Sequence, residues 1–297
     1  MEKKKLLLIY NPYSGKAELK AKLSDITDLY TKNGYLVTVY PTQCEKDAIN
    51  IVKQYAHKYD MMVCSGGDGT VSEIMNGLLS VSKRPTLGYI PSGTVNDFAS
   101  SLNISKNTMI AAQTVIDGKP FKCDVGTFND TPFSYIAAFG LFTDVSYQTS
   151  QDTKNILGRM AYILEGAKRL NNIPVYTLTI ETEKETICGE FMYGMITNST
   201  SIGGFKGLSE EHVKMDDGVF EVIMAKKPKN LVDLHMLLQC VMTATPDPKY
   251  LYTTHAKSIK ITSATKIDWT LDGEFGGSLT NVDIENHNQA VTIMVDR

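Results

Sequence analysis

Features that would place the chain outside the cell or across a membrane are missing from its sequence. The 297 residues include only five cysteines, at positions 44, 64, 123, 188 and 240, and none has Cys-x-x-Cys spacing. An odd number of scattered cysteines argues against a disulfide framework. No run of eighteen apolar residues occurs, so we expect no membrane-spanning helix. The start, MEKKKLLLIY, has too few apolar residues for a secretory leader. We therefore expect a cytoplasmic protein with reduced thiols.

A strong excess of charge of one sign is also absent. The chain has 30 Lys and Arg against 33 Asp and Glu, and its formal net charge is -3. Because this balance gives no general attraction to a polyanion, we expect no nucleic-acid partner. A polyanionic ligand must instead be held by a local arrangement of residues.

The first 120 residues alternate between segments typical of strands and segments typical of helices. We expect strands at Lys5–Tyr10, Tyr35–Pro41, Met61–Cys64 and Thr86–Ile90. We expect helices at Ala17–Asn33, Lys46–Tyr59, Thr70–Leu79 and Asn107–Asp117. This order predicts an α/β domain with a doubly wound parallel sheet, in which ligands bind outside the carboxyl ends of the strands.

From about residue 121 strand-like segments follow one another with few helices between them. We expect strands at Phe133–Phe142, Val175–Glu181, Gly189–Thr197, Val219–Ala225, Ser258–Ile267 and Ala290–Val295, and helices at Gly158–Leu170 and Leu231–Ala244. Such a pattern favours antiparallel β architecture. With a boundary near residues 119–123, the sequence predicts an α/β domain over 1–122 and a β-rich domain over 123–297.

Three of the expected parallel strands end in loops of small residues. These are NPYSGK (Asn11 to Lys16), SGGDGT (Ser65 to Thr70) and PSGTVNDFA (Pro91 to Ala99). Taken alone, the glycines of SGGDGT fit either a tight turn or a cradle of backbone N–H groups around a phosphate. Because the fold brings all three loops to one edge of the sheet, the cradle is the better interpretation.

A P-loop is excluded by spacing. NPYSGK lacks the GxxxxGK[ST] pattern, and Ala17 stands where a magnesium-binding Ser or Thr would follow the lysine.

At this point the sequence resembles a known family. NPYSGK, SGGDGT, PSGTVNDFA, the Cys123 to Gly126 step, LGRMAYILEG (Leu157 to Gly166), MDDG (Met215 to Gly218) and LDGE (Leu271 to Glu274) are similar to motifs of bacterial diacylglycerol kinases. That family also resembles sphingosine and ceramide kinases. GGDGT alone is shared with NAD kinases and phosphofructokinases, whereas PSGTVNDFA together with LDGE points to lipid kinases.

The resemblance implies an N-terminal nucleotide domain, a C-terminal β-sandwich-like domain, and an active site between them that uses ATP and Mg²⁺. In that family the C-terminal segment can pack back on the first domain, and the sequence leaves this open. The residues implied or expected to hold the nucleotide are Asn11, Ser14, Thr42, Gly66, Gly67, Asp68, Gly69, Thr70 and Thr94.

Four charged residues are candidates for the chemistry of phosphoryl transfer. Asp68 and Asp97 stand in small-residue loops, where a hydrated Mg²⁺ would offset the cost of burying a carboxylate. For Asp97 the structural alternative is a turn or helix-capping aspartate. Lys16 offers a positive charge near phosphate. Glu274, beside two glycines at the end of a strand-like run, is the best candidate for a general base, against the alternative of a hairpin-turn glutamate.

A second metal site is implied only by the resemblance. The family places a structural Mg²⁺ at the DDG segment, which maps onto Asp217 with the carbonyls of Lys214 and Val219. An ordinary hairpin with a DG turn is the alternative.

The expected function is an ATP-dependent lipid kinase that converts diacylglycerol to phosphatidic acid and reaches its substrate peripherally on a membrane. The alternatives are a kinase of a soluble acceptor such as NAD, and a non-catalytic nucleotide or lipid binder. Leu231–Ala244 could lie on the bilayer, but it carries no Lys or Arg, so we expect it to pack on the core. The identity of the lipid and assembly into a homodimer stay open.

Overall fold

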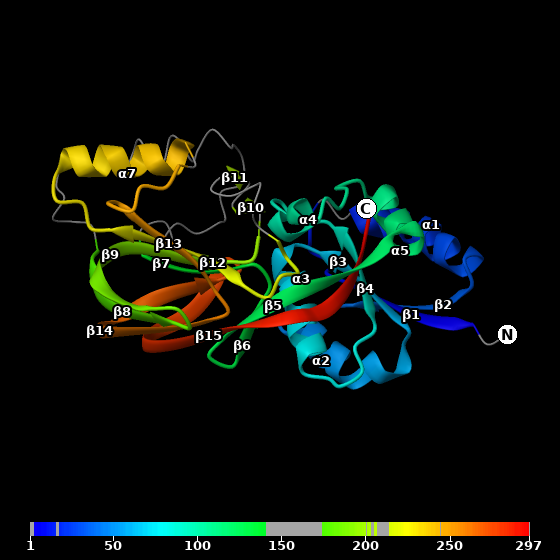
Figure 1. Ribbon diagram of the computed structural model, residues 1–297. Helices are drawn as coiled ribbons and strands as arrows, with labels where there is room; N and C mark the ends of the chain where they lie inside the picture. The colour runs from blue at the N-terminus through cyan, green and yellow to red at the C-terminus, as the bar shows by residue number, and fades with distance from the viewer. Residues whose placement is uncertain are drawn as a thin grey trace.

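The computed structural model describes residues 3–15, 18–140, 174–199, 201–202, 205–206, 214–243 and 245–296 (Figure 1). Its strands are β1 (Lys4–Tyr10), β2 (Tyr35–Pro41), β3 (Met61–Gly66), β4 (Thr86–Pro91), β5 (Lys119–Phe128), β6 (Thr131–Phe133), β7 (Ile136–Gly140), β8 (Tyr176–Thr182), β9 (Thr186–Thr197), β10 (Ser201–Ile202), β11 (Phe205–Lys206), β12 (Phe220–Lys226), β13 (Leu251–Ala256), β14 (Ser258–Leu271) and β15 (Glu274–Val295). Its helices are α1 (Glu18–Lys32), α2 (Asp47–Tyr55), η1 (Ala56–Lys58), α3 (Asp68–Leu79), α4 (Asp97–Ser101), α5 (Thr108–Asp117) and α7 (Leu231–Thr243). The chain has a mixed α/β fold.

The first four strands pair in parallel, in the order β4-β3-β1-β2. Helix α1 packs against α5 and α2 packs against α3, and Figure 1 shows α1 and α5 above the strands and α2 below them. Leu6 to Ile9 of β1 and Met62 to Cys64 of β3 are almost fully buried, as expected for short apolar runs in a parallel sheet. The parallel pairing predicted for these strands is confirmed.

Two helices of this part differ from the sequence prediction at the residues that matter for the site. Helix α3 begins at Asp68 rather than Thr70, because Gly67 takes the N-cap position and an aspartate is favourable in a first helical turn. The PSGTVNDFA segment, predicted as a loop, contains the short helix α4 after Asn96, which has a positive φ of 57°. Asn tolerates this left-handed conformation better than most residues.

The later strands pair antiparallel and close on themselves. Strand β7 pairs with β9 and β14, and β8 also pairs with β14 and β9, so these four strands form a circuit. Aromatic side chains fill its interior, where Trp269 contacts Phe128 and Phe139. The strand predicted at Phe133–Phe142 is interrupted. Phe133 is the last residue of β6, Ser134 and Tyr135 form a connection, and β7 begins at Ile136.

The last strand, β15, joins the two parts of the sheet. It pairs with β14 and β5, and Ile293 pairs in parallel with Leu87 of β4. The predicted boundary at residues 119–123 lies inside the continuous strand β5, which runs beside the end of β15. Within the described residues, the parallel and antiparallel strands therefore belong to one 13-stranded sheet.

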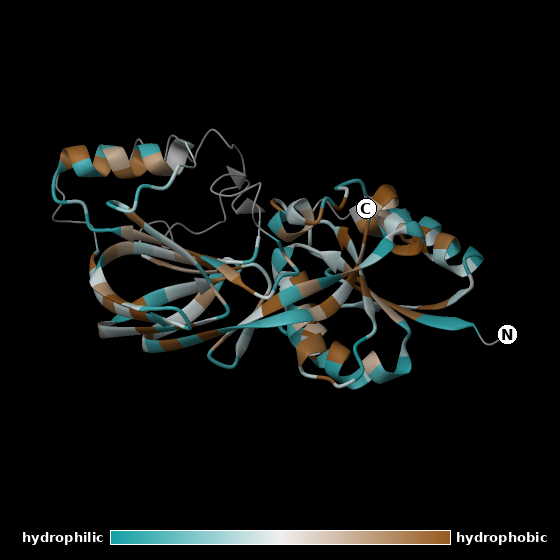
Figure 2. Ribbon diagram, viewed as in Figure 1, coloured by the Kyte–Doolittle hydropathy of each residue, from teal (hydrophilic) through white to brown (hydrophobic). Residues whose placement is uncertain are grey.

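Helix α7 packs one face on the molecule. Leu234, Leu237 and Cys240 are buried, whereas Leu231 and Val232 in its first turn are exposed. Figure 2 shows hydrophobic and hydrophilic bands alternating along it. Core packing predicted for this segment is confirmed at the buried residues, and no helix in the described ranges is long and apolar enough to cross a membrane. The expected helix Gly158–Leu170 lies outside the described residues.

Candidate active site

The ends of three parallel strands and one hairpin meet around a cleft of about 430 Å³. Backbone bonds hold the loops together, since the N–H of Asn11 donates to the Ser65 carbonyl and that of Thr42 donates to the Tyr10 carbonyl, both at 2.9 Å. The lining residues are Asn11, Tyr13, Ser14, Thr42, Gln43, Cys44, Glu45, Gly67, Gly69, Thr70, Glu73 and Glu274. Seven of them are residues that the sequence assigns to the nucleotide or to catalysis.

The glycine turn after β3 is shaped by a close backbone approach. A Cβ added at Gly93, in the turn after β4, would lie 2.6 Å from the Cα of Gly67. Only glycines allow these two turns to pack so tightly. Gly69, by contrast, has no atom within 4 Å of an added Cβ and is exposed to the cleft. The first turn of α3 thus presents open backbone to the cleft, which suits an anion.

Asp68 and Asp97 form an acidic pair beside this turn. The N–H groups of Asp97 and Phe98 donate to the Asp68 carboxylate at 3.3 Å each, which ties α4 to the start of α3. Burial, together with the charge of Asp97, raises the pKa of Asp68 to about 6. The side chain of Asp97 is 3% exposed. Two neighbouring carboxylates, one buried and one half-buried, fit a divalent cation, because the cation offsets the repulsion that helps to raise this pKa.

Glu274 reaches the cleft from the opposite side, on the hairpin between β14 and β15. Asp272 and Gly273 at its tip have φ angles of 48° and 89°, and Leu271 pairs with Glu274 across the turn. The Glu274 side chain is exposed and lines the cleft together with the glycine turn. An exposed carboxylate in this position can accept a proton from a molecule that enters the cleft.

The DDG segment forms a turn held by a buried aspartate. The carboxylate of Asp124 accepts 2.6 Å bonds from the N–H groups of Gly218 and Gln289, and burial raises its pKa. Asp217 is exposed and its Oδ1 accepts the Val219 N–H at 3.2 Å. No cluster of three or more His, Cys, Asp or Glu side chains arranged for a metal occurs within the described ranges.

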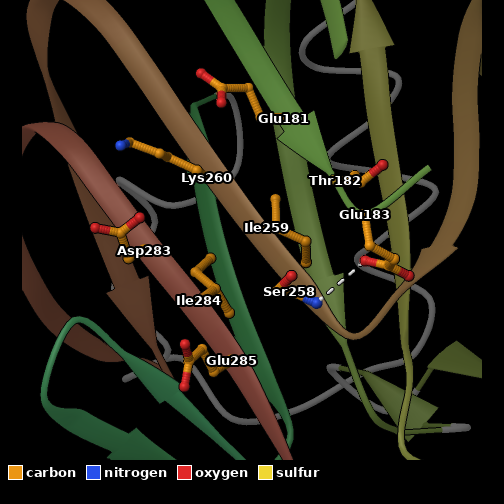
Figure 3. Close-up of a pocket in the computed structure, with 9 residues that line it drawn as sticks. All are labelled: Glu181, Thr182, Glu183, Ser258, Ile259, Lys260, Asp283, Ile284 and Glu285. Atoms are coloured by element: carbon orange, nitrogen blue, oxygen red, sulfur yellow. Dashed lines mark hydrogen bonds between the residues drawn. The ribbon is translucent and has the colours of Figure 1, made fainter. Parts of the chain in front are cut away.

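A second hollow, of about 300 Å³, lies on strands β8, β14 and β15. Figure 3 shows Lys260 between the carboxylates of Glu181 and Asp283, as the strand register requires. It is a row of alternating charges on a sheet surface and contains none of the residues predicted for the nucleotide, for catalysis or for a metal. The glycine-lined cleft is therefore the candidate site.

Five of the residues predicted for the nucleotide or for catalysis are not among the residues that line the cleft. Two of them, Asp68 and Asp97, lie beside the glycine turn. Gly66 is the last residue of β3 and directly precedes the turn. Thr94 is exposed in the turn after β4. Lys16 lies outside the described residues.

Known proteins with related sequences match along almost the whole chain. The diacylglycerol kinase catalytic domain model matches residues 5–128. A diacylglycerol kinase of Staphylococcus aureus is 36% identical over 280 residues, which cover 93% of this chain and 88% of that protein. The chain belongs to the diacylglycerol kinase family. It is a kinase, and the resemblance predicted from its motifs is confirmed.

Other members of the diacylglycerol kinase family agree with this assignment. A diacylglycerol kinase of Bacillus subtilis is 33% identical over 93% of this chain and 91% of its own length. A Bacillus anthracis crystal structure, described as a candidate diacylglycerol kinase, superposes with a TM-score of 0.82 at 26% identity and covers 100% of this chain and 96% of that one. The similarity therefore extends to the β-rich part beyond residue 128.

Sequence reasoning missed two carboxylates that shape the candidate site. Glu73 accepts the N–H groups of Lys46 and Ala48, at 2.8 and 3.3 Å, and so caps helix α2 at the rim of the cleft. Asp272 is buried beneath the Glu274 hairpin. Asp272 belongs to the LDGE motif and Glu73 lies three residues after SGGDGT. Their hydrogen-bond partners lie 25 to 200 residues away, so no local sequence pattern indicates them.

Proposed function

We propose that the protein is an ATP-dependent lipid kinase that transfers the γ-phosphoryl group of ATP to the hydroxyl of diacylglycerol, giving phosphatidic acid and ADP. The observation that carries this proposal is that the glycine turn and Glu274 line one cleft, while Asp68 and Asp97 lie next to each other at the start of α3, beside that turn. Diacylglycerol is favoured as the acceptor because the relatives from Staphylococcus aureus and Bacillus subtilis are named for it.

We further propose a division of labour along the chain. A doubly wound domain over residues 1–122 would bind the nucleotide, and a sandwich-like domain over 123–297 would present the acceptor. The C-terminal end of β15, which pairs with β4 and β5, supports a rigid connection between them. Such a connection fixes Glu274 relative to the glycine turn.

Phosphoryl transfer mainly requires positioning and neutralisation of charge. ATP, when bound, supplies the γ-phosphoryl group, and the backbone of Gly67, Gly69 and Thr70 would hold its phosphates. Glu274 would accept the proton as the lipid oxygen bonds to the γ-phosphorus and the bond to ADP breaks. Asn11, Ser14, Thr42 and Thr94 would complete the nucleotide site, and Lys16 would add a positive charge.

Mg²⁺ would be held at two places. Asp68 and Asp97 fit an ion carried by ATP, for the electrostatic reason given above. At the DDG turn, Asp217 with the carbonyls of Lys214 and Val219 would hold a structural ion. The charges of Asp217 and Asp216 help to raise the pKa of Asp124, which indicates a negative potential suited to a cation.

The structural ion can be tested without nucleotide. We expect Mg²⁺ to stabilise the wild type by about 2.7 kcal/mol at a hundredfold excess over its Kd, and Asp217→Ala to abolish most of that gain. The measurement is the melting temperature in ATP-free buffer with and without Mg²⁺. Asp216→Ala, in the same turn, is the control and should keep most of the response. Equal Mg²⁺ responses in wild type and Asp217→Ala would reduce the segment to an ordinary turn.

We propose that the enzyme acts from the cytoplasm and touches the membrane peripherally, since its acceptor is a bilayer lipid. The exposed Leu231 and Val232 follow three lysines, Lys226, Lys227 and Lys229, which is a composition compatible with such contact. A homodimer would be compatible with the same function.

The function is tested by supplying labelled ATP with diacylglycerol in vesicles, or with NAD. We expect transfer to diacylglycerol only. Gly69→Ala should lower both ATP affinity and this transfer, because its methyl group enters the cleft, while helix stability is kept or raised. Transfer to NAD instead would favour a kinase of a soluble acceptor. ATP binding without transfer to any acceptor would favour a non-catalytic binder.

A further inference from the structure

The carboxylate of Asp272 accepts four hydrogen bonds beside the site. It accepts the N–H groups of Ser134 at 2.6 Å, Tyr135 at 3.0 Å and Ile136 at 3.1 Å. It also accepts the hydroxyl of Ser72 at 2.7 Å. Four donors around one buried carboxylate make a rigid arrangement, since each is a hydrogen bond to a charged group.

The Ser72 bond differs from the other three because it comes from the nucleotide side of the cleft. Ser72 lies on α3, one turn after Asp68 and close to Gly69, whereas Asp272 lies two residues before Glu274. The bond therefore joins elements 200 residues apart in the sequence.

A turn-forming role alone accounts for only part of this arrangement. The φ of 48° at Asp272 suits a hairpin turn, and the bonds to residues 134–136 fix the hairpin on β6 and β7. Neither requires a bond to α3. The Ser72 hydroxyl adds a direct link from the Glu274 hairpin to the helix whose first turn forms the phosphate cradle.

We propose that Ser72 and Asp272 are positioning residues, whose hydrogen bond holds the Glu274 hairpin at a fixed distance from the glycine turn. This inference rests on the proposed function, because it requires Glu274 to act as the base. A shift of about 1 Å in a reacting group can cost as much as a hundredfold in rate. Loss of the bond therefore lowers kcat and leaves the contacts of the protein with the nucleotide unchanged.

The test combines Ser72→Ala with Glu274→Gln. We expect Ser72→Ala alone to lower kcat about tenfold with an unchanged KM for ATP, and Ser72→Thr to restore kcat because it keeps the hydroxyl. In the Glu274→Gln background Ser72→Ala should change kcat less than twofold, because the base it positions is already lost. Ser80→Ala, which removes a hydroxyl bonded only within α3 and its end, is the control with wild-type kcat.

A purely structural role predicts a different result. It would lower kcat by the same factor with and without Glu274, and this outcome, or wild-type kcat in Ser72→Ala, would overturn the proposal. Hydrogen exchange at residues 271–276 measures the link without an acceptor, and we expect faster exchange there in Ser72→Ala. If exchange accelerates but the wild type phosphorylates no lipid, the proposed function fails while the link between α3 and the hairpin stands. Unchanged exchange overturns the link itself.

Discussion

Replacing Glu274 with Gln is expected to lower kcat by about 10² to 10⁴, while ATP affinity and the melting temperature stay near those of the wild type. Removal of a general base typically costs this much in rate. Gln has the size of Glu but accepts no proton at neutral pH. Because the Glu274 side chain is exposed, its substitution leaves no buried group without a partner.

The same preparation should give the ATP affinity, the melting temperature and the single-turnover rate. Glu285→Gln, an exposed glutamate farther along β15, controls for the loss of a negative charge on that strand and should keep full activity. If Glu274 only stabilised the hairpin, stability would fall and turnover per folded molecule would survive. Near wild-type turnover in Glu274→Gln would remove this residue from the mechanism.

The parallel half of the fold could be predicted because its signals are local. The strand predicted at Tyr35–Pro41 coincides with β2, and those predicted to start at Met61 and Thr86 do start there. Each is a short apolar or β-branched run bounded by Gly, Pro or polar residues, and this pattern reflects burial between neighbouring strands. The loops at their ends then meet because parallel strands share one carboxyl edge.

The remaining features depend on contacts between distant residues. No local pattern indicates that Ile293 pairs with Leu87, or that β5 runs unbroken through the predicted boundary. The hydrogen-bond partners of Asp272 could not be predicted either, because a hairpin turn already explains an Asp-Gly pair in the sequence. Sequence motifs identified most residues that line the cleft but not those that fix their distances.

The raised pKa of Asp68 indicates that its ionised carboxylate is unfavourable in the folded protein, because of burial and the charge of Asp97. An aspartate with a pKa of 3.8 in the unfolded chain and about 6 in the folded protein binds protons more strongly when folded. The free energy of unfolding therefore falls as the pH rises from about 4 to about 6. Above about pH 6 the folded protein carries the full free-energy cost of the ionised Asp68 carboxylate. The cost is about 3 kcal/mol, an upper limit for a partly solvated carboxylate.

Asp68→Asn is accordingly expected to stabilise the metal-free protein at pH 8 while abolishing Mg²⁺-dependent activity. The asparagine oxygen can still accept an N–H from α4, but the side chain carries no charge to be repelled by Asp97. We expect a gain of about 1–3 kcal/mol, or several degrees in melting temperature for a chain of this length. The gain should fade as the pH falls from 6 to 4, because the wild-type carboxyl then becomes protonated in the folded state.

Melting curves of wild type and Asp68→Asn between pH 4 and 8, in chelator and without nucleotide, measure this difference directly. Asp130→Asn, which removes a carboxylate from an exposed turn, is the control and should show no pH-dependent gain. Added Mg²⁺ with ATP should then reverse the order, since only the wild type offers the cation both carboxylates. If Asp68→Asn were less stable than the wild type at pH 8 in chelator, the hydrogen bonds from α4 to Asp68 would outweigh its repulsion from Asp97. The main role of Asp68 would then be structural.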